Sequence, residues 1–442
     1  MKRIVALSLC MLLLAVVLFT GCSNSSGAPA EEPNAPAEES PAEETAEAPV
    51  EDITLDLWHI WTTETDTQID ALNLAIDAVA AAYPNISLEV TGTETNTYKT
   101  VLPTALATDE APDIFYYWGA GMAGAEVEAG NVLDLTDYYE GDAELQAKLP
   151  RSALYYTTFN DRIYGLTFPL NLGCLYCNTE IFEANGVKVP ETYDEMLTAA
   201  EQLSAAGIVP MSLGGASLWP VLHQMGGLCI KEAGADACNA ALTGEGSFNT
   251  PEFIEAARKF QELAANGMYS DSVMSVDYDT SCTAFQNGEA AMLFMGTWAI
   301  GGIDTSPANG KVVVMPWPDP GKGHENDFFG GSVDAFWISS RTEYPDECWN
   351  VLKLMTETMS KEGYKLGVFM PIWDVSDVEA EVSPLFKDAM DMASTAEGYT
   401  LWWDTFLGNE KGNTCNEYCC ALLTGEMTPE EFVVAMDALV AE

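Results

Sequence analysis

The chain has 442 residues and carries 18 Lys and Arg against 68 Asp and Glu, a formal net charge of −50 at pH 7. This balance argues strongly against nucleic acid as a partner, because nucleic-acid affinity depends on Lys and Arg that neutralise phosphates. It also argues against a basic membrane-binding face. Acidity of this kind most often serves solubility, and a cationic ligand is the alternative.

The N-terminus has the layout of a secretory signal peptide. Two basic residues precede an apolar run from Ile4 to Phe19, which is too short and too early for a permanent membrane span. The segment Leu18-Phe19-Thr20-Gly21-Cys22 resembles the bacterial lipobox, whose cysteine is acylated and becomes the first residue of the mature protein. We predict a signal peptide over 1–21 and lipidation of Cys22. An ordinary signal peptide with a chance cysteine is the alternative.

Residues 22–52 have the composition of an acidic tether. Ala, Pro, Glu and Ser dominate, without an aromatic residue, so the segment cannot bury enough apolar surface to offset the entropy of ordering it. Its prolines stiffen it and its glutamates repel one another. This order of a lipid, a spacer and a globular body predicts a protein that is anchored to the outer face of a membrane and separated from the membrane surface by the spacer. A merely solubilising leader would have the same structure.

Strand and helix patterns alternate along the body of the chain. Strands are expected at 53–61, 86–90 and 113–118, and helices at 69–80 and 98–107. This order favours a mainly parallel sheet with helices on both faces. A further strand is expected at 166–176, and further helices at 193–206, 251–266, 344–358 and 429–440. Because this body is too long for one small core, we expect two α/β lobes.

The cysteines and histidines do not point to a metal or a redox cofactor. Once Cys22 is lipidated and the signal peptide removed, nine of the 11 cysteines remain, so at least one thiol is free or the compartment is reducing. Cys229 and Cys238 flank a short loop rich in Gly and Ala and are candidates for a disulfide. Cys174 and Cys177 have CxxC spacing but lie in a strand pattern, where residues three apart point to opposite faces. The three histidines have no metal-ligand spacing.

Several short segments in a fixed order give the chain a family resemblance. They are Leu106–Phe115, Gly130–Thr136, Ile163–Pro169 leading into Leu175–Asn178, Phe285–Met292 with Gly296–Trp298, and Leu422–Glu431. From about Thr54 to its end the chain resembles the extracellular solute-binding proteins of bacterial ABC importers, in particular the sugar-binding group with maltodextrin- and raffinose-type binders. The richness in cysteine and the low lysine content depart from this group.

The resemblance implies an α/β, two-lobed clamp of the periplasmic-binding-protein fold, with a ligand cleft between the lobes. It implies lobe I at 53–168 and 332–374, and lobe II at 169–331 and 375–442. The chain would cross between the lobes at Pro169, around Phe329 to Gly331, and from Pro371 to Trp373. Glycine suits a hinge because it absorbs backbone rotation cheaply. The implied partners are a carbohydrate ligand and the transmembrane permease subunits of an importer, without a cofactor.

The tryptophans are the main argument from residues for a sugar ligand. Several of the 11 lie at strand ends or in loops, where open α/β sheets bind their ligands. Aromatic faces pack on the C–H faces of sugar rings, while the hydroxyls need carboxylate and amide partners. With the matching family positions, the predicted ligand-binding set is Trp61, Trp118, Asn171, Trp219, Trp298, Gly331, Asp334, Trp402, Trp403 and Asp404. Core packing is the alternative for each tryptophan and the expected role of Trp58. His59 and His223 are left out of the set.

We therefore expect a binding protein without catalytic residues that captures an extracellular carbohydrate, an oligosaccharide, by lobe closure and delivers it to a permease. Two alternatives stay open. The same fold could bind a polyamine or another non-sugar solute. A surface glycoside hydrolase would need two carboxylates across the sugar bond, and the sequence singles out no such pair.

Overall fold

The structure is a computed structural model that describes residues 51–62, 67–108 and 110–441. The predicted signal peptide, the lipid at Cys22 and the tether up to residue 50 lie outside the described residues. Among the helices that are described, none combines the length and the apolar character needed to cross a bilayer.

The first sheet has five strands in the order β2-β1-β3-β12-β6. Their bounds are β1 Ile53–His59, β2 Ile86–Gly92, β3 Ile114–Trp118, β6 Gly165–Thr167 and β12 Asp334–Ile338. As expected from the alternation of strands and helices, β1 runs parallel to both β2 and β3. Strand β12 comes from a distant part of the chain and runs antiparallel to β3 and β6. The first lobe is therefore closed by a segment that local sequence patterns could not place.

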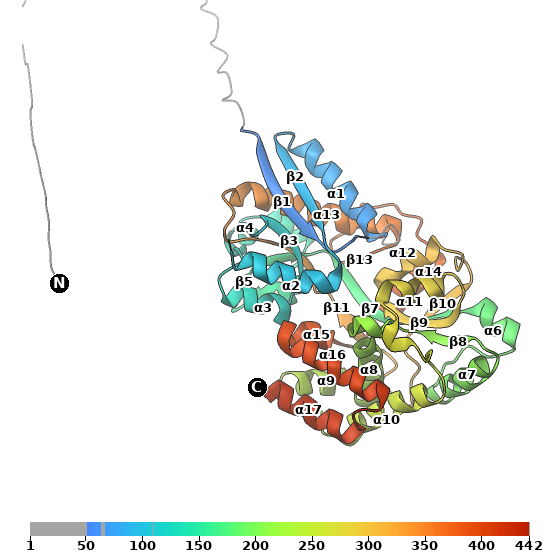
Figure 1. The fold of residues 1–442 in the computed structure, drawn as a ribbon. Helices are drawn as coiled ribbons and strands as arrows, with labels where there is room; N and C mark the ends of the chain where they lie inside the picture. The colour runs from blue at the N-terminus through green and yellow to red at the C-terminus, as the bar shows by residue number, and fades with distance from the viewer. Residues whose placement is uncertain (1–50, 63–66, 109, 442) are drawn as a thin grey trace, which may run out of the picture. The chain divides into compact units, whose positions relative to one another are not determined.

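Helices surround this sheet, and we refer to the sheet and these helices as lobe I. The elements that accompany the sheet are α1 Gln68–Ala82, α2 Thr95–Leu106, α3 Gly121–Glu128, α4 Thr136–Glu140, α5 Ala143–Lys148, α13 Pro345–Leu366 and the small hairpin of β4 Thr158–Phe159 and β5 Arg162–Ile163. Helices α1 and α13 lie side by side, blue and orange in Figure 1. Ala71, Leu72, Ala75 and Val79 recur at steps of three and four residues and are fully buried, which is why α1 packs on the core with one face.

The second sheet has seven strands. They are β7 Pro169–Asn178, β8 Val209–Ser212, β9 Ala290–Gly296, β10 Val312–Met315, β11 Asp327–Gly331, β13 Met370–Pro371 and β14 Gly398–Thr400. Strand β7 is antiparallel to β9, β10, β11 and β13, while β8 is parallel to β9 and β11 to β14. This sheet is mixed, so the expected mainly parallel arrangement is wrong for it.

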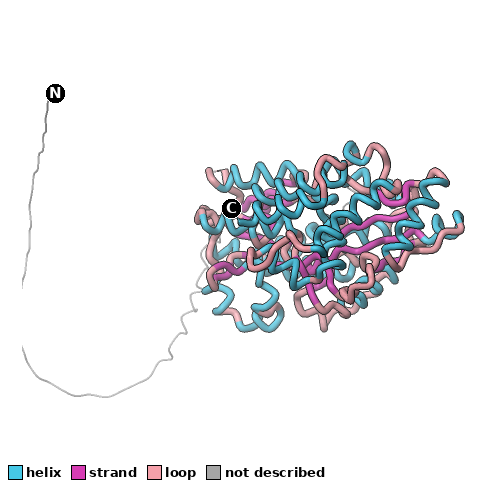
Figure 2. Tube along the Cα trace, turned by 90° about the horizontal axis from the view of Figure 1, so that it is seen from below, coloured by secondary structure: helices cyan, strands magenta, loops and turns pink. Residues whose placement is uncertain are grey.

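We refer to this sheet and the helices around it as lobe II, and Figure 2 shows helices and strands side by side over the described body. Its helices are α6 Thr179–Asn185, α7 Tyr193–Ala205, α8 Trp219–Ala233, α9 Ala235–Leu242, α10 Pro251–Ala265, α11 Tyr278–Gln286, α12 Ile300–Asp304, α14 Pro384–Ala393, α15 Trp403–Leu407, α16 Asn409–Thr424 and α17 Pro429–Ala441. Helix α8 is buried on nearly all sides. Its buried residues include the polar Gln224, Lys231 and Glu232, and it was not among the helices expected from the sequence.

Helices replace the loop that was expected between Cys229 and Cys238. Cys229 lies in α8 and Cys238 in α9, and both carry free, buried thiols, so the candidate disulfide does not form. Cys174 and Cys177 point to different sides of β7, because they belong to two separate core clusters. The expectation for this CxxC pair is confirmed.

The chain passes from one sheet to the other at short connections. The single strand expected at 166–176 is two strands in different sheets, β6 and β7, which are separated by Phe168. Gly330 lies near the end of β11, just before the connection to β12, and its φ is 143°. A Cβ at Gly330 would lie 2.2 Å from the carbonyl oxygen of Asn171, so only glycine fits where β11 meets β7. Strand β13, which falls within the range 332–374 predicted for lobe I, pairs with β7 in the second sheet, beside the predicted crossing at Pro371. The lobe bounds stay a prediction.

Candidate ligand-binding cleft

A cleft with about 740 Å³ of empty volume opens to solvent between the two sheets. Its described lining includes residues from both lobes. They are Ile60, Trp61, Gln68, Thr95, Lys99, Tyr116, Trp118, Phe168, Asn171, Trp219, His223, Tyr278, Trp298, Asp334, Phe369, Trp402, Asp404 and Thr405. The walls combine aromatic rings with amide, hydroxyl and carboxylate groups, so the cleft can hold a ligand that has both apolar faces and many hydroxyls.

Most of the predicted site residues line this cleft, and their contact with a ligand stays a prediction. Trp403 and Gly331 are the two exceptions. Trp403 is fully buried and packs on Phe248 and Phe329, with ring centroids 5.1 and 6.1 Å apart. Trp403 is the first residue of α15, whereas Trp402 precedes the helix with a non-helical backbone, and of the two only Trp402 lines the cleft. Gly331 has no side chain and pairs with Asn171 in the sheet.

A hydrogen-bonded carboxylate joins the two lobes at the cleft. Asp334 on β12 accepts a hydrogen bond from the Tyr116 hydroxyl and another, at 2.7 Å, from the Asn171 amide on β7. Asn171 in turn accepts from the Thr297 hydroxyl at 3.1 Å. Burial raises the pKa of Asp334, and the hydrogen bonds from Tyr116 and Asn171 oppose that rise. The carboxylate therefore fixes the orientation of the Asn171 side chain.

An ion pair spans the cleft at a second place. Lys99 on α2 lies 3.6 Å from the Asp404 carboxylate on α15, and their side chains are only 13% and 6% exposed. The Lys99 ammonium also lies 5.1 Å from the centre of the Trp118 ring, which places a cation over an aromatic face. Asp404 accepts a further hydrogen bond from the backbone N–H of Thr405 at 2.9 Å. The only Lys or Arg in the described lining is thus already paired.

Lobe II presents an aromatic wall. The Trp298 indole N–H donates to the Tyr278 hydroxyl at 3.1 Å, and the ring of Trp219 lies 4.9 Å from that of Tyr278. Trp219 and Trp298 remain partly exposed in the cleft. Trp402 is only 4% exposed, because His223 stacks on it and Phe329 meets it edge-on. Trp219 and Trp298 therefore offer more free surface to a ligand than Trp402 does.

Trp61 and Trp118, the two cleft tryptophans of lobe I, also differ in how much of their surface is exposed. Trp61 is 4% exposed, donates its indole N–H to Gln68 at 2.8 Å, and packs on Tyr116 with ring centroids 5.0 Å apart. It belongs mostly to the core of lobe I. Trp118, at the carboxyl end of β3, remains partly exposed beneath Lys99.

Several lining residues were not in the predicted set, and His223 is the most distinctive of them. It stands one helical turn after Trp219 on α8, with the two ring centroids 4.8 Å apart. That spacing of four residues is a signal that could have added His223 to the set. Lys99, Gln68 and Tyr278 carry no such signal, because only the packing of distant helices brings them to the cleft.

Comparison with known proteins places this architecture among proteins that bind solutes outside the cell. Residues 75–388 match the family described as bacterial extracellular solute-binding protein. The chain is 27% identical over 277 residues to a multiple sugar-binding protein of Streptococcus mutans, covering 60% of this chain and 63% of that protein. It is 24% identical over 453 residues to an uncharacterized ABC transporter extracellular-binding protein of Pyrococcus horikoshii, covering 100% of this chain and 92% of that one.

A solved structure is similar over almost the whole described body. It comes from work on xylan utilization by the thermophilic bacterium Caldanaerobius polysaccharolyticus, and it aligns with a TM-score of 0.83 and 29% identity. The alignment covers 87% of this chain and 99% of that structure. The predicted two-lobed α/β fold is confirmed.

Proposed function

The chain belongs to the bacterial extracellular solute-binding proteins, and from this premise we propose that it binds a neutral oligosaccharide between its lobes and delivers it to an ABC importer. The observation that carries the proposal is the composition of the cleft. Partly exposed Trp118, Trp219 and Trp298 supply aromatic faces, and amide and hydroxyl groups stand beside them. Sugars need both kinds of partner.

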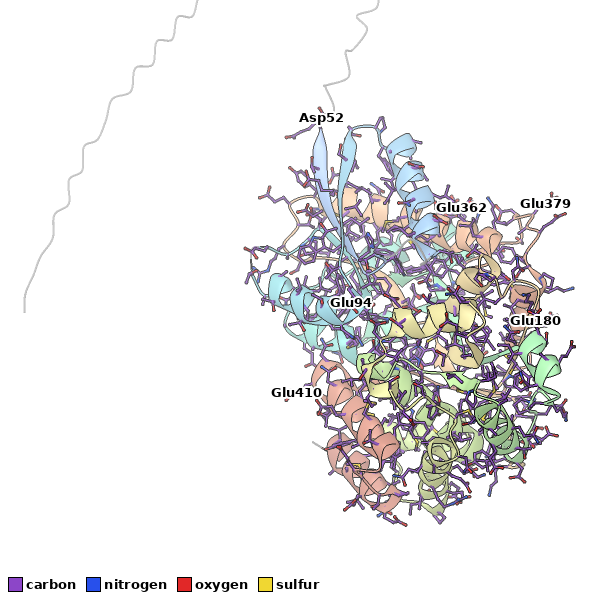
Figure 3. All side chains as sticks on the ribbon, turned by 45° about the vertical axis from the view of Figure 1, so that its right-hand side comes forward. Asp52, Glu94, Glu180, Glu362, Glu379 and Glu410 are labelled. Atoms are coloured by element: carbon purple, nitrogen blue, oxygen red, sulfur yellow. The ribbon has the colours of Figure 1, made fainter. Side chains whose placement is uncertain are left out.

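The charges in the cleft favour a neutral ligand. Its described lining has two carboxylates, and each already has protein donors: Asp334 is held by Tyr116 and Asn171, and Asp404 by Lys99. A polyamine would need several unpaired carboxylates, and an acidic sugar would need an unpaired cation. Much of the negative charge of the chain lies elsewhere: the acidic residues labelled in Figure 3 are spread over the described body outside this lining.

The same pairing favours a binding protein over a hydrolase. A glycosidase places one carboxylic acid and one carboxylate on either side of the scissile bond. Asp334 and Asp404 are instead engaged by hydrogen bonds and an ion pair that position other cleft residues. The relatives' names, a sugar-binding protein and a transporter binding protein, support transport as the purpose.

A panel of ligands tests this proposal. Xylotriose, maltotriose, chitotriose and raffinose are each added to the protein, with spermidine as the cationic comparison, and the melting temperature is measured. We expect at least one neutral oligosaccharide to raise the melting temperature, because a ligand that binds only the folded state stabilises it by mass action. A rise with spermidine alone, or cleavage products in chromatograms of the incubated sugars, would contradict the proposal.

We further infer that lipid at Cys22 holds the protein on the outer face of the membrane, with residues 23–52 as the tether. The lipobox-like segment supports this inference. Replacing the sulfur by Cys22→Ser should release the protein from the membrane fraction or leave an uncleaved precursor. Normal processing and full membrane retention of that variant, checked by fractionation and mass spectrometry, would speak against lipidation.

A further inference from the structure

His223 occupies a central place in the aromatic wall of the cleft. Its ring stacks on Trp402 with centroids 4.3 Å apart and an angle of 17° between the planes. Trp219 and Phe329 meet it edge-on, at 4.8 and 5.7 Å. The side chain is 4% exposed and lines the cleft. Its orientation is therefore fixed by rings on several sides.

The polar atoms of this imidazole are not used by the surrounding protein. Nδ1 is enclosed and has no hydrogen-bond partner in the described part of the chain. Leaving an enclosed N–H without an acceptor is more costly than leaving a lone pair unfilled, so the proton belongs on Nε2. Burial lowers the pKa of His223 to about 4, which keeps the ring neutral at neutral pH. The Nε2–H group is then the donor that the ring can offer to the cleft.

His59 shows that a buried histidine of this chain can have a hydrogen-bond partner for its Nδ1. It is equally buried, with 4% of its surface exposed, and burial also lowers its pKa to about 4. Its Nδ1, however, accepts a hydrogen bond from the backbone N–H of Trp61 at 3.1 Å, and it does not line the cleft. The Nδ1 of His59 thus has a hydrogen-bond donor within lobe I, whereas the Nδ1 of His223 has none among the described residues, although its ring is held in place by other rings.

We propose that His223 is a specificity-determining residue whose Nε2–H group donates a hydrogen bond to an oxygen atom of the bound sugar. This inference rests on the proposed function. Aromatic faces recognise any sugar ring with a C–H face, so they discriminate poorly between sugars. A buried donor in a fixed position rejects ligands that present no oxygen there, because the donor would stay unpaired. His223 therefore selects which hydroxyl pattern the cleft accepts.

Two substitutions separate this role from simple packing. His223→Phe keeps an aromatic ring on Trp402 but removes both nitrogens, while His223→Gln keeps an N–H donor. With the panel oligosaccharide that raises the wild-type melting temperature most, we expect His223→Phe to bind about 10-fold more weakly. His223→Gln should recover a large part of that loss. The matched control is His324→Gln, because His324 does not line the cleft.

Deoxygenated sugars identify the accepting oxygen. Mono-deoxy analogues of the same oligosaccharide are titrated into the wild type and into His223→Phe by calorimetry. One analogue should bind the wild type about 10-fold more weakly than the parent sugar, yet bind His223→Phe as well as the parent does. A His223→Phe protein that binds every sugar with wild-type affinity would overturn the inference while leaving the proposed function intact.

A measurement on the wild type covers the case in which His223→Phe folds poorly. Long-range ¹H–¹⁵N spectra of the histidine rings should show Nε2–H as the neutral tautomer of His223 and a changed Nε2 signal when the sugar is added. An unchanged signal at saturating sugar would contradict the inference. A panel in which no oligosaccharide binds would overturn the proposed function and this inference together.

Discussion

At the residue scale, the two tryptophans of lobe II that seemed equivalent in the sequence have different surroundings. Trp298 is partly exposed and donates to Tyr278, whereas Trp402 is 4% exposed between His223 and Phe329. A side chain that lines a cleft contributes chiefly to affinity, while an enclosed one contributes to the stability of the fold. Both residues line the cleft, but only Trp298 offers a free face.

Alanine substitutions should reveal this difference. Trp298→Ala is expected to cost about 2–4 kcal/mol of binding free energy, as for a hot-spot residue, with little change in melting temperature. Trp402→Ala is expected to cost about 3–5 kcal/mol of the free energy of unfolding, because it leaves a cavity. Calorimetric titration and thermal unfolding of both variants measure the two quantities. Early melting of Trp298→Ala with undiminished affinity of the folded fraction would make Trp298 a core residue.

His223 should also make stability depend on pH. Its pKa is lowered from the ordinary value of 6.5 to about 4, first of all by burial. Between these values the unfolded chain binds a proton and the folded protein does not, so the free energy of unfolding falls as the pH drops from 6.5 toward 4. At pH 4.5 the loss should be about 2–3 kcal/mol for this residue. Urea denaturation at pH 7 and 4.5 should show a smaller loss for His223→Gln, and an equal loss would contradict the assignment.

At the scale of elements, the connections between the sheets depend on close backbone contact. Strand β7 carries Asn171 into the cleft and pairs with β11 through Gly330 and Gly331. Gly330 combines a φ of 143° with a carbonyl 2.2 Å from where a Cβ would stand. The position of Asn171, and through it that of Asp334, thus depends on the absence of a side chain in the neighbouring strand.

Gly330→Ala should therefore destabilise the protein strongly, by about 3 kcal/mol or more, because neither the backbone conformation nor the space admits a methyl group. Gly321→Ala is the matched control: its φ is 82°, also positive, but nothing lies within 4 Å of its would-be Cβ. We expect that control to cost only about 1–2 kcal/mol. Urea denaturation compares the two variants. Equal losses would show that conformation alone, and not the contact with β7, requires glycine at Gly330.

At the scale of the whole described body, groups from both lobes meet across the cleft. The Lys99–Asp404 ion pair joins α2 to α15, and Asp334 on β12 is held by Asn171 on β7. A ligand shifts an open–closed equilibrium only if it binds the closed form better, which requires contacts to both lobes. The lining contributed by both lobes meets that requirement.

Small-angle scattering should therefore show a smaller radius of gyration when the protein is saturated with a panel oligosaccharide that binds. Lys99→Met should reduce this change and weaken binding, because Asp404 would be buried without its cation in the closed form. The control is Lys365→Met, whose ammonium pairs with Glu362 on the outside of α13. A radius that sugar leaves unchanged in the wild type would exclude closure, although binding itself would stand.

Local sequence patterns correctly predicted those helices and strands that pack on the core with one face. The alternation of apolar residues in β1 and the helical repeat of α1 are visible in the chain, because one face of each element meets the core. Helix α8 and the division between β6 and β7 were missed: the first is buried all round, and the second depends on which sheet each strand joins. Most of the residues predicted from family-like segments and from tryptophans at strand ends line the cleft, but much of the lining was not predicted.

Only the tertiary structure decided which face of each element meets the cleft. Trp402 and Trp403 are neighbours in sequence, yet one lines the cleft and the other lies in the core, because the helix α15 begins between them and turns the second side chain away. Lys99 and Asp404 are 305 positions apart and meet only because both lobes are folded. The sequence by itself determined the kind of molecule and the chemistry available to it. The packing of distant segments decided which of those groups are paired, which are buried, and which, like His223, remain available for a ligand.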